Sequence, residues 1–452
     1  MQVPVKLIES LYGTMGFHKD AFERVHNSGE QITSIRYNPV KNYELQTSNN
    51  KFSPIPWCRN GFYLAARPSF TFDPLFHAGT YYVQEASSMF IEQAIQQTAD
   101  LSKPLKVLDL CAAPGGKSTH LHSLISKNSL LVSNEVIRAR ANVLKENIIK
   151  WGCENVLVTN NDPKDFARLE NYFDVILIDA PCSGSGLFRR DPDAINEWSE
   201  NNVQLCSQRQ QRIIADIWPC LKRDGILIYS TCSYSKDEDE HIMDWITGEL
   251  SASNCRLEID SDWGITTTST ANGNQGYRFW PDQVKGEGFF LACFQKQEGD
   301  TDCSTRTKSK PEPVTKKDMA MVQNWVKKDE KYFIKHLNTV YAWPEKQVAD
   351  FSFLLEQLRV IYSGVLTGEL MRDKLVPDHA LAMSQLVVKT IQHTELNREQ
   401  AIQYLQRKEF GMVENKGWQL VTFQQHPLGW INALSNRVNN YYPKEMRILK
   451  DQ

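Results

Sequence analysis

The alternation of apolar and amphipathic segments between residues 105 and 296 constrains the fold more than any other feature of the chain. Strands alternating with helices predict a parallel sheet covered by helices on both faces. A final core strand is expected at 288–296. We therefore predict an α/β fold for this region. The expected strands are 106–111, 130–134, 156–159, 173–179 and 225–230, and the expected helices are 117–127, 138–151 and 204–221. A further helix is expected before this region, at 85–101, and a short strand after it, at 362–366.

Two of the predicted strands are followed closely by a cysteine. Cys182 comes after the strand at 173–179 and Cys232 after the strand at 225–230. In a doubly wound sheet the carboxyl ends of the strands open into the ligand crevice, so we expect both thiols in one cleft. A lone cysteine is more often a small buried apolar residue. Two thiols at matched strand ends instead favour covalent group transfer.

A glycine-rich turn with the sequence DLCAAPGGK occupies residues 109–117, between the first strand and the first helix. The motif contains neither the Gly-x-Gly-x-x-Gly dinucleotide fingerprint nor the Walker spacing of a triphosphate site. Gly115 and Gly116 permit close approach of a ligand to the backbone, and the helix N-terminus suits a carboxylate. A nucleoside that carries an amino-acid tail fits these features, and S-adenosylmethionine is such a ligand.

Acidic residues follow the next two strands. Glu135 closes the strand at 130–134, where a carboxylate can accept hydrogen bonds from ribose hydroxyls. Asp162 follows the strand at 156–159, where it could meet the adenine amino group. Either carboxylate alone could be a solvated strand end or a helix cap. Because both follow the glycine-rich turn in the expected order, we predict that they bind the cofactor.

A pair of thiols suits methyl transfer to C5 of cytosine. That carbon is a poor nucleophile until a thiolate adds at C6, and the adduct must afterwards lose the C5 proton and expel the thiol. One cysteine is needed for the attack, and a second could assist release. Asp179, three residues before Cys182, could bond to the base and stabilise the adduct.

These motifs resemble the NOL1/NOP2/Sun family of RNA cytosine-5 methyltransferases. The resemblance lies in LCAAPGGK at 110–117, DAPCSGSG at 179–186 and STCS at 230–233. It implies an S-adenosylmethionine-dependent enzyme with a Rossmann-like sheet, in which Cys232 is the nucleophile, Cys182 assists release and Lys117 lies near the base. The cofactor contacts that it implies are Cys111, Ala112, Ala113, Pro114, Gly115, Gly116, Lys117, Glu135, Asp162 and Asp179.

The resemblance extends outward with shorter motifs. SIRYN at 34–38 and YVQEASS at 82–88 are similar to segments that precede the catalytic domain in this family. The segments at 377–382 and 427–430 look like the RNA-binding tail of bacterial small-subunit ribosomal RNA methyltransferases, where a PUA-like domain follows the catalytic one. Their aromatic, Gly and Pro residues could equally form a core and its turns.

Composition divides the chain into four parts. We predict an N-terminal α+β extension at 1–75, the catalytic domain at 76–296, a polar linker at 297–318 and an RNA-binding region at 319–452. From residue 304 onward there are 22 Lys and Arg against 16 Asp and Glu, a net charge of +6 within a chain of −3. A basic region suits RNA. It could fold as a separate docking module or pack permanently on the catalytic domain.

The remaining features narrow the class of protein. The chain has ten cysteines but no Cys-x-x-Cys pair, so we expect neither a disulfide framework nor a metal site. No signal-peptide core and no stretch of roughly 20 apolar residues is evident, which predicts a cytoplasmic protein without a membrane segment. We also expect a monomer. The preferred substrate is small-subunit ribosomal RNA. The alternatives are a tRNA cytosine-5 methyltransferase, a methyltransferase acting on protein or another base, and a non-catalytic ribosomal RNA-binding or assembly factor.

Overall fold

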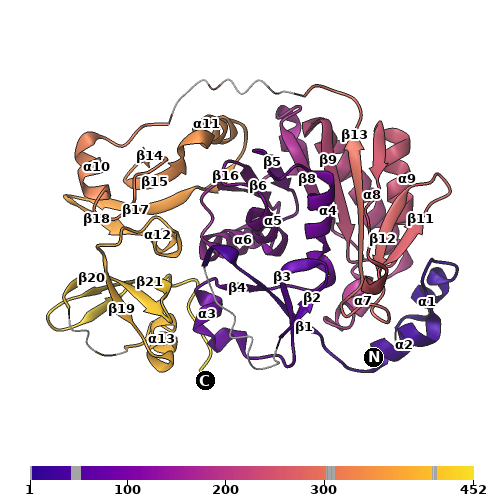
Figure 1. Ribbon diagram of the computed structural model, residues 1–452, viewed down its shortest axis with the longest axis horizontal. Coiled ribbons are helices and arrows are strands. Elements are labelled where there is room, and N and C mark those ends of the chain that lie inside the picture. Colours follow the sequence, from indigo (N-terminus) through magenta and orange to yellow (C-terminus); the bar gives the residue numbers. More distant parts are fainter. Residues whose placement is uncertain are drawn as a thin grey trace.

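A mixed ten-stranded sheet forms the centre of the computed structural model, which describes residues 3–41, 52–301, 303, 307, 311–409, 411 and 415–451 (Figure 1). Five parallel strands lie in its middle in the order β7-β6-β5-β8-β9. The strand order reverses next to β5, which is where doubly wound sheets bind ligands. The parallel strands are β5 (Lys106–Asp109), β6 (Leu130–Asn134), β7 (Val156–Thr159), β8 (Phe173–Asp179) and β9 (Leu221–Thr231).

Antiparallel strands extend the sheet at both edges. Beside β9 lies β13 (Phe289–Lys296), followed by β12 (Gln275–Phe279) and β11 (Thr266–Ser269). The short strand β10 (Ala252–Cys255) also pairs with β13. At the opposite edge, β16 (Val360–Ser363) pairs with β7.

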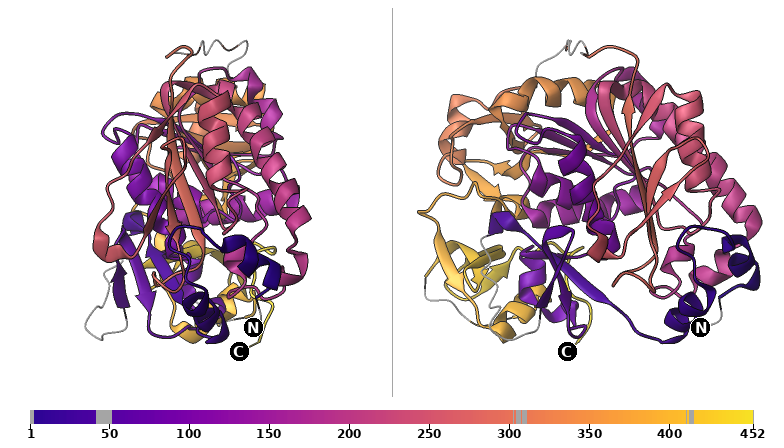
Figure 2. Two further views of the ribbon diagram at one scale, coloured as in Figure 1. Left: turned by 90° about the vertical axis from the view of Figure 1, so that its right-hand side faces the viewer. Right: turned by 45° about the vertical axis from the view of Figure 1, so that its right-hand side comes forward.

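Alternating residues of the parallel strands build two cores, one on each face of the sheet. Val107 belongs to the first core and its neighbour Leu108 to the second, and Val175 and Ile176 divide in the same way. Strands that are buried on both faces must be apolar throughout, which explains their unbroken apolar sequences. Figure 2 shows helices on both sides of the sheet. The first core is covered by α4 (Ile91–Thr98), α5 (Gly116–Leu124) and α6 (Arg138–Trp151), and the second by α8 (Glu200–Ile217), α9 (Glu240–Glu249) and α11 (Val348–Gln357).

The N-terminal region forms a small sheet of its own, next to the helices that cover the first core of the central sheet. Its strands run in the order β2-β3-β1-β4. Arg36, in β1, is buried and donates hydrogen bonds to the Gly116 carbonyl and the Thr119 hydroxyl of α5. The extension therefore supports the helix that follows the glycine-rich turn. Its elements are α1 (Val5–Leu11), α2 (Lys19–Asn27), β1 (Thr33–Tyr37), β2 (Phe52–Ile55), β3 (Cys58–Leu64), α3 (Pro74–His77) and β4 (Tyr81–Val83).

The C-terminal region contains two four-stranded sheets, β14-β15-β17-β18 and β19-β20-β21-β22. The region packs directly against the central sheet, because β16 pairs with β7 and α11 contributes Phe351 and Leu354 to the second core. The domain boundaries themselves stay predictions. The elements are α10 (Lys316–Val322), β14 (Lys331–His336), β15 (Thr339–Pro344), β17 (Val365–Met371), β18 (Lys374–Pro377), α12 (His379–Met383), β19 (Gln392–Glu395), α13 (Arg398–Leu405), β20 (Gly417–Phe423), β21 (His426–Ala433) and β22 (Val438–Asn440).

Three sequence predictions need correction. The helix predicted at 204–221 ends at Ile217, and Leu221 already starts β9. A helix predicted at 85–101 is an α-helix only from Ile91 to Thr98, after a 3₁₀ turn. A single strand predicted at 362–366 is divided at Gly364 into the end of β16 and the start of β17, which belong to different sheets.

Parts of the predicted linker, residues 302, 304–306 and 308–310, lie outside the described residues. Among the described helices, none combines the length and the apolar character needed to cross a membrane.

Candidate active site

The glycine-rich turn leads directly from β5 into α5. Gly115 has a φ of +113° and Gly116 opens the helix, so the backbone turns sharply at a position that L side chains rarely tolerate. The turn is held from α6, because Asn147 donates to the Pro114 carbonyl at 2.8 Å and Arg140 to the Ala113 carbonyl at 2.9 Å. The N-terminus of α5, with its positive end, is thereby presented at the edge of the sheet.

Asp109 lies beneath this turn and is fully buried. Its Oδ2 accepts the Ser118 hydroxyl at 2.6 Å, while its Oδ1 has no hydrogen-bond partner among the described residues. Burial raises the pKa of Asp109 to about 7. Cys111 lies two residues further along the turn. Burial, and then the neighbouring carboxylates, raise its pKa, so it stays a thiol.

Glu135 is buried at the end of β6, as predicted. Its Oε1 accepts the Ile137 N–H at 2.9 Å, and its Oε2 lies 3.5 Å from the Arg140 guanidinium. Arg140 thus links the Glu135 carboxylate to the glycine-rich turn. A carboxylate beside a glycine turn and a helix N-terminus fits the ribose and the amino-acid tail of S-adenosylmethionine.

Lys117 and Asp179 form an ion pair between α5 and β8, with Nζ and Oδ2 2.7 Å apart. Ser230, in β9, donates its hydroxyl to the other oxygen, Asp179 Oδ1, at 2.9 Å. Burial alone would lower the pKa of Lys117, but Asp179 and Asp109 raise it overall, so this lysine keeps its charge. A cation and a hydrogen-bonded carboxylate therefore lie together at the crevice.

The two thiols meet as predicted: Cys182 Sγ and Cys232 Sγ are 2.8 Å apart, and both cysteines are free. They come from neighbouring parallel strands, β8 and β9, whose carboxyl ends share one edge. The hydrogen bond to Cys232, and then burial, raises the pKa of Cys182 well above its ordinary value. Cys182 therefore keeps its proton at neutral pH.

Asp162 has a local structural role. Its side chain accepts the Lys164 N–H at 3.2 Å and forms a capping box with Asp165 at the 3₁₀ turn Pro163–Arg168. The contact with adenine stays a prediction.

Sequence reasoning missed three residues that support the site: Ser230, Arg140 and Glu238. Glu238 lies in the acidic run 237–240, which reads as a solvated surface segment but is largely buried at 238–240. Only its spacing of six residues from Cys232 could have drawn attention to it.

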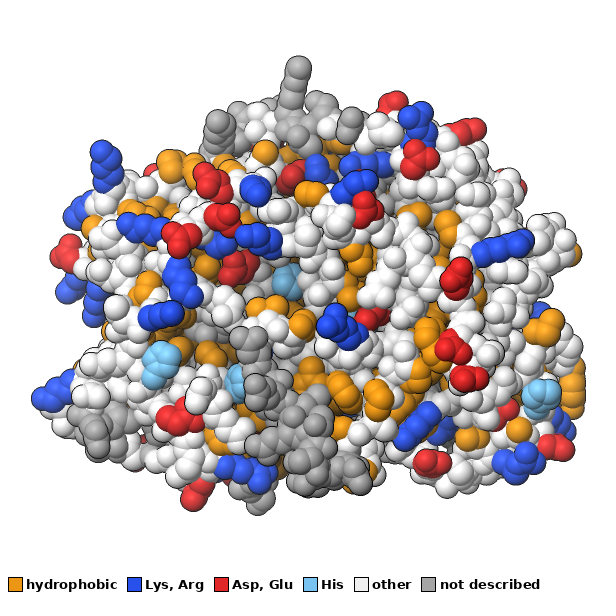
Figure 3. All heavy atoms as spheres, viewed as in Figure 1, with side chains coloured by type: hydrophobic (Ala, Val, Ile, Leu, Met, Phe, Trp, Pro, Cys, Tyr) orange, Lys and Arg blue, Asp and Glu red, His pale blue; other side chains and the backbone are white. Residues whose placement is uncertain are grey.

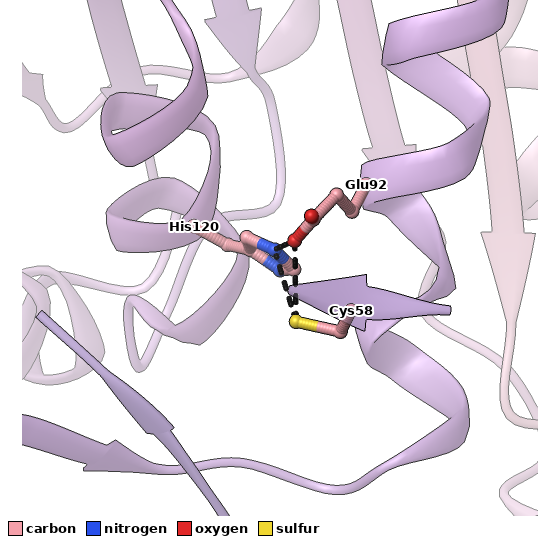
Figure 4. A group of neighbouring side chains, drawn as sticks. All are labelled: Cys58, Glu92 and His120. Atoms are coloured by element: carbon pink, nitrogen blue, oxygen red, sulfur yellow. Dashed lines mark hydrogen bonds and ion pairs between the residues drawn. The ribbon is translucent and has the colours of Figure 1, made fainter. Parts of the chain in front are cut away.

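A second polar cluster lies between the N-terminal sheet and α5 (Figure 4). Glu92 Oε2 accepts hydrogen bonds from His120 Nε2 at 2.8 Å and from the Cys58 thiol at 3.2 Å, and Glu92 Oε1 accepts the Arg59 N–H. All three side chains are buried, and burial lowers the pKa of His120 to about 4. A neutral imidazole and a protonated thiol satisfy the carboxylate, so the cluster links β3, α4 and α5.

The fold and this site define a Rossmann-like methyltransferase. The sequence matches the family models "16S rRNA methyltransferase RsmB/F" over residues 97–295, "N-terminal domain of 16S rRNA methyltransferase RsmF" over 3–86 and "Methyltransferase RsmF PUA domain" over 392–448. Ribosomal RNA small subunit methyltransferase F from Shewanella woodyi is 30% identical over 87% of this chain and 84% of its own. The homologue from Shewanella loihica is 27% identical over 99% and 96%. The chain belongs to the 16S rRNA methyltransferase RsmB/F family and is an S-adenosylmethionine-dependent methyltransferase.

Solved structures agree with this assignment. A methyltransferase homologue from Pyrococcus horikoshii has a TM-score of 0.52 at 27% identity and covers 65% of this chain and 100% of its own. NSun6 from the same organism, crystallised with SFG, has a TM-score of 0.53 at 19% identity over 66% and 99%, which shows the shared fold.

Proposed function

We propose that this enzyme methylates C5 of a cytidine in 16S ribosomal RNA through a covalent bond between Cys232 and C6 of the base. The observation that carries the proposal is the pair of free thiols, Cys182 and Cys232, with sulfurs 2.8 Å apart at adjacent strand ends. Amine and oxygen acceptors need no covalent adduct, so a second thiol has no role in their methylation. The names of the similar ribosomal RNA methyltransferases support the choice of RNA.

The turn at 111–117 and Glu135 would hold the cofactor, together with Asp162 and Asp179, as predicted from the sequence. S-adenosylmethionine supplies the methyl group when bound. The chain's own residues prepare the base: Cys232 adds to C6 as the thiolate, and the Lys117–Asp179 ion pair is proposed to contact the polar edge of the base. Adding sulfur at C6 raises the electron density at C5, which then accepts the methyl group.

Release requires that C5 lose its proton to a base, for which water suffices. The electron pair of the C5–H bond then forms the C5–C6 double bond, and the bond between Cys232 and C6 breaks to give the Cys232 thiolate. Cys182 keeps its proton and lies against the departing sulfur, so it can donate a hydrogen bond to the Cys232 thiolate as that bond breaks. A hydrogen bond to an ion is stronger than one between neutral groups, so Cys182 favours departure. The base must be unstacked to expose C6, which predicts a loop or a flipped nucleotide as the target.

The C-terminal region is the proposed docking surface for RNA. Figure 3 shows Lys and Arg side chains gathered over α10 and the β14-β15-β17-β18 sheet. Exposed Lys316 and Lys317 lie in α10, and exposed Arg372 and Lys374 at the turn from β17 to β18. We propose a cytoplasmic enzyme that acts as a monomer on ribosomal RNA.

The docking surface is tested by a salt series. Replacing Lys316, Lys317, Arg372 and Lys374 by Gln should weaken RNA binding. It should also reduce the slope of log K against log salt concentration by about 0.7 for each phosphate contact that is lost. Lys6 and Lys103, which already pair with carboxylates, provide a control pair whose replacement should leave the slope unchanged. An unchanged slope in the fourfold variant would contradict the proposed surface.

Bisulfite sequencing of RNA from cells with and without the gene tests the reaction and the substrate together. We expect one or more 5-methylcytidines of 16S RNA to disappear and to return when the gene is restored. Loss confined to tRNA would favour the tRNA enzyme, and no loss in any RNA would favour a non-catalytic binding or assembly factor.

A further inference from the structure

A single buried carboxylate, Glu238, is bonded to both thiol-bearing loops. Its Oε1 accepts the Ser183 N–H at 2.8 Å, and its Oε2 accepts the hydroxyls of Ser183 at 2.5 Å and Ser233 at 2.6 Å. Ser183 directly follows Cys182, and Ser233 directly follows Cys232. One side chain therefore holds the residue that directly follows each thiol, through the backbone and hydroxyl of Ser183 and the hydroxyl of Ser233.

Glu238 is itself held from two further elements. Gln210, in α8, donates to Glu238 Oε1 at 3.2 Å, and the Tyr229 hydroxyl, in β9, donates to the Glu238 carbonyl at 2.6 Å. Burial raises the pKa of Glu238 above its ordinary value, and the hydrogen bonds from Ser183, Ser233 and Gln210 offset part of this effect. Four donors around two oxygens suit the ionised, acceptor-only form of the carboxylate.

The two loops are also linked directly. The Gly186 N–H donates to the Cys232 carbonyl at 2.8 Å, and the Tyr234 N–H donates to the Ser185 hydroxyl at 2.9 Å, but these loop residues lie four and three positions beyond Cys182. The Ser183 and Ser233 hydroxyls are 3.4 Å apart, a longer contact than the bonds of 2.5 and 2.6 Å that each makes with Glu238. The carboxylate therefore makes the shorter bonds at the residues that directly follow the two cysteines.

We propose that Glu238 is a positioning residue that sets the spacing between the Cys182 and Cys232 sulfurs. The consequence for catalysis rests on the proposed function, in which attack uses only Cys232 while release uses both thiols. Loss of the common anchor lets the loops separate. Release should then slow more than attack, and the covalent protein–RNA complex should accumulate.

The spacing can be measured without RNA or cofactor by titration with phenylarsine oxide, which binds two neighbouring thiols at one arsenic atom. We expect Glu238→Ala to weaken this binding at least about tenfold relative to wild type. Glu238→Gln has the same shape and can bond to both serines, so it should recover much of the affinity. The signal of Cys182→Ala measures binding to the other cysteines, and it is subtracted from the signal of every other protein.

The matched control is Asp237→Asn. Asp237 is adjacent in the same acidic run, but its carboxylate pairs with His241 at 3.1 Å and not with the two serines. We expect wild-type arsenical binding in this variant. If Glu238→Ala also binds phenylarsine oxide as the wild type does, the positioning role is overturned.

Folding and reaction chemistry are separated by two further measurements. If Glu238→Ala does not fold, judged by melting and S-adenosylmethionine binding, the double variant Ser183→Ala, Ser233→Ala removes both hydroxyl anchors and decides the question with the same titration. Turnover with RNA, followed on denaturing gels, should show more covalent complex in Glu238→Ala than in wild type. If no variant and no wild type forms that complex, the proposed function fails while the arsenical titration still reports the spacing.

Discussion

The two thiols of the site are each followed by a serine but have different roles in the proposed reaction. The hydrogen bond with Cys232 and burial raise the pKa of Cys182, and the two sulfurs lie 2.8 Å apart. We expect Cys232→Ala to abolish methyl transfer while S-adenosylmethionine still binds, because the cofactor residues lie at other strand ends. In Cys182→Ala the bond between Cys232 and C6 should form normally but break slowly. The covalent protein–RNA complex should then accumulate and be visible as a band on denaturing gels.

The double variant Cys182→Ala, Cys232→Ala is the control for this band, which should be absent there. Normal turnover by Cys182→Ala would contradict its assigned role. A band that persists in Cys232→Ala would show that another residue attacks the base.

Glu135 is the second residue whose role can be tested alone. It is buried with one carboxylate oxygen 3.5 Å from Arg140. A charge-assisted hydrogen bond to the ribose is worth roughly 1.5–3 kcal/mol. Glu135→Ala should therefore weaken S-adenosylmethionine binding by about 10- to 100-fold in titration calorimetry. Glu154, which pairs with Lys331, is a control position where the change to Ala should leave the affinity unchanged. Equal affinity in Glu135→Ala would remove this residue from the site.

At the scale of elements, the sequence predicted the parts that depend on local pattern. The bounds of β6, α6, β7 and β8 agree with the predicted ranges, because each is an apolar or amphipathic stretch with clear ends. The meeting of Cys182 and Cys232 was predictable too, since adjacent parallel strands end at one edge.

What could not be predicted depends on long-range pairing. The stretch 362–366 has one strand-like pattern, and nothing local shows that its first two residues pair with β7 and its last two with β15. The support given by Glu238 was hidden for the same reason, because its acidic run becomes buried only when the loops after β8 and β9 close over it.

The division between β16 and β17 depends on Gly364. Its φ is +58°, and a Cβ there would lie 2.5 Å from the Ala342 carbonyl oxygen. A left-handed conformation costs L residues about 1–2 kcal/mol, and the close approach adds to this cost. We expect Gly364→Ala to lower the free energy of unfolding by at least about that amount in denaturant titrations.

Gly248→Ala is the matched control for Gly364→Ala. Gly248 lies in α9 with open space around its Cα, so alanine should be neutral or stabilising there. Equal stability of the two variants would show that the junction tolerates a side chain.

At the scale of the whole molecule, the C-terminal region takes part in the catalytic core. Phe351, in α11, is fully buried in the second core and packs its ring against Trp343. Phe351→Ala should cost about 3–5 kcal/mol and should lower the temperature at which S-adenosylmethionine binding is lost. In the same helix Leu355 is 41% exposed, so Leu355→Ala should change little.

A separately folded docking module would give a different result. Phe351→Ala would then melt the C-terminal region alone and leave cofactor binding at its wild-type temperature. The packing of α11 and β16 also argues that a chain ended near Lys296 would expose the edge of β7 and part of the second core.

The pairing of β16 with β7 has a consequence for how the protein is made. The edge of β7 ends at Thr159, and its partner starts at Val360, so 201 residues must be synthesised before the sheet can be completed. At about 5–20 residues per second this interval lasts on the order of 10–40 s. An apolar strand with an unpaired edge is a template for association with other chains. Nascent chains stalled before residue 360 should therefore be captured by chaperones, and chains stalled well beyond residue 363 should be released from them.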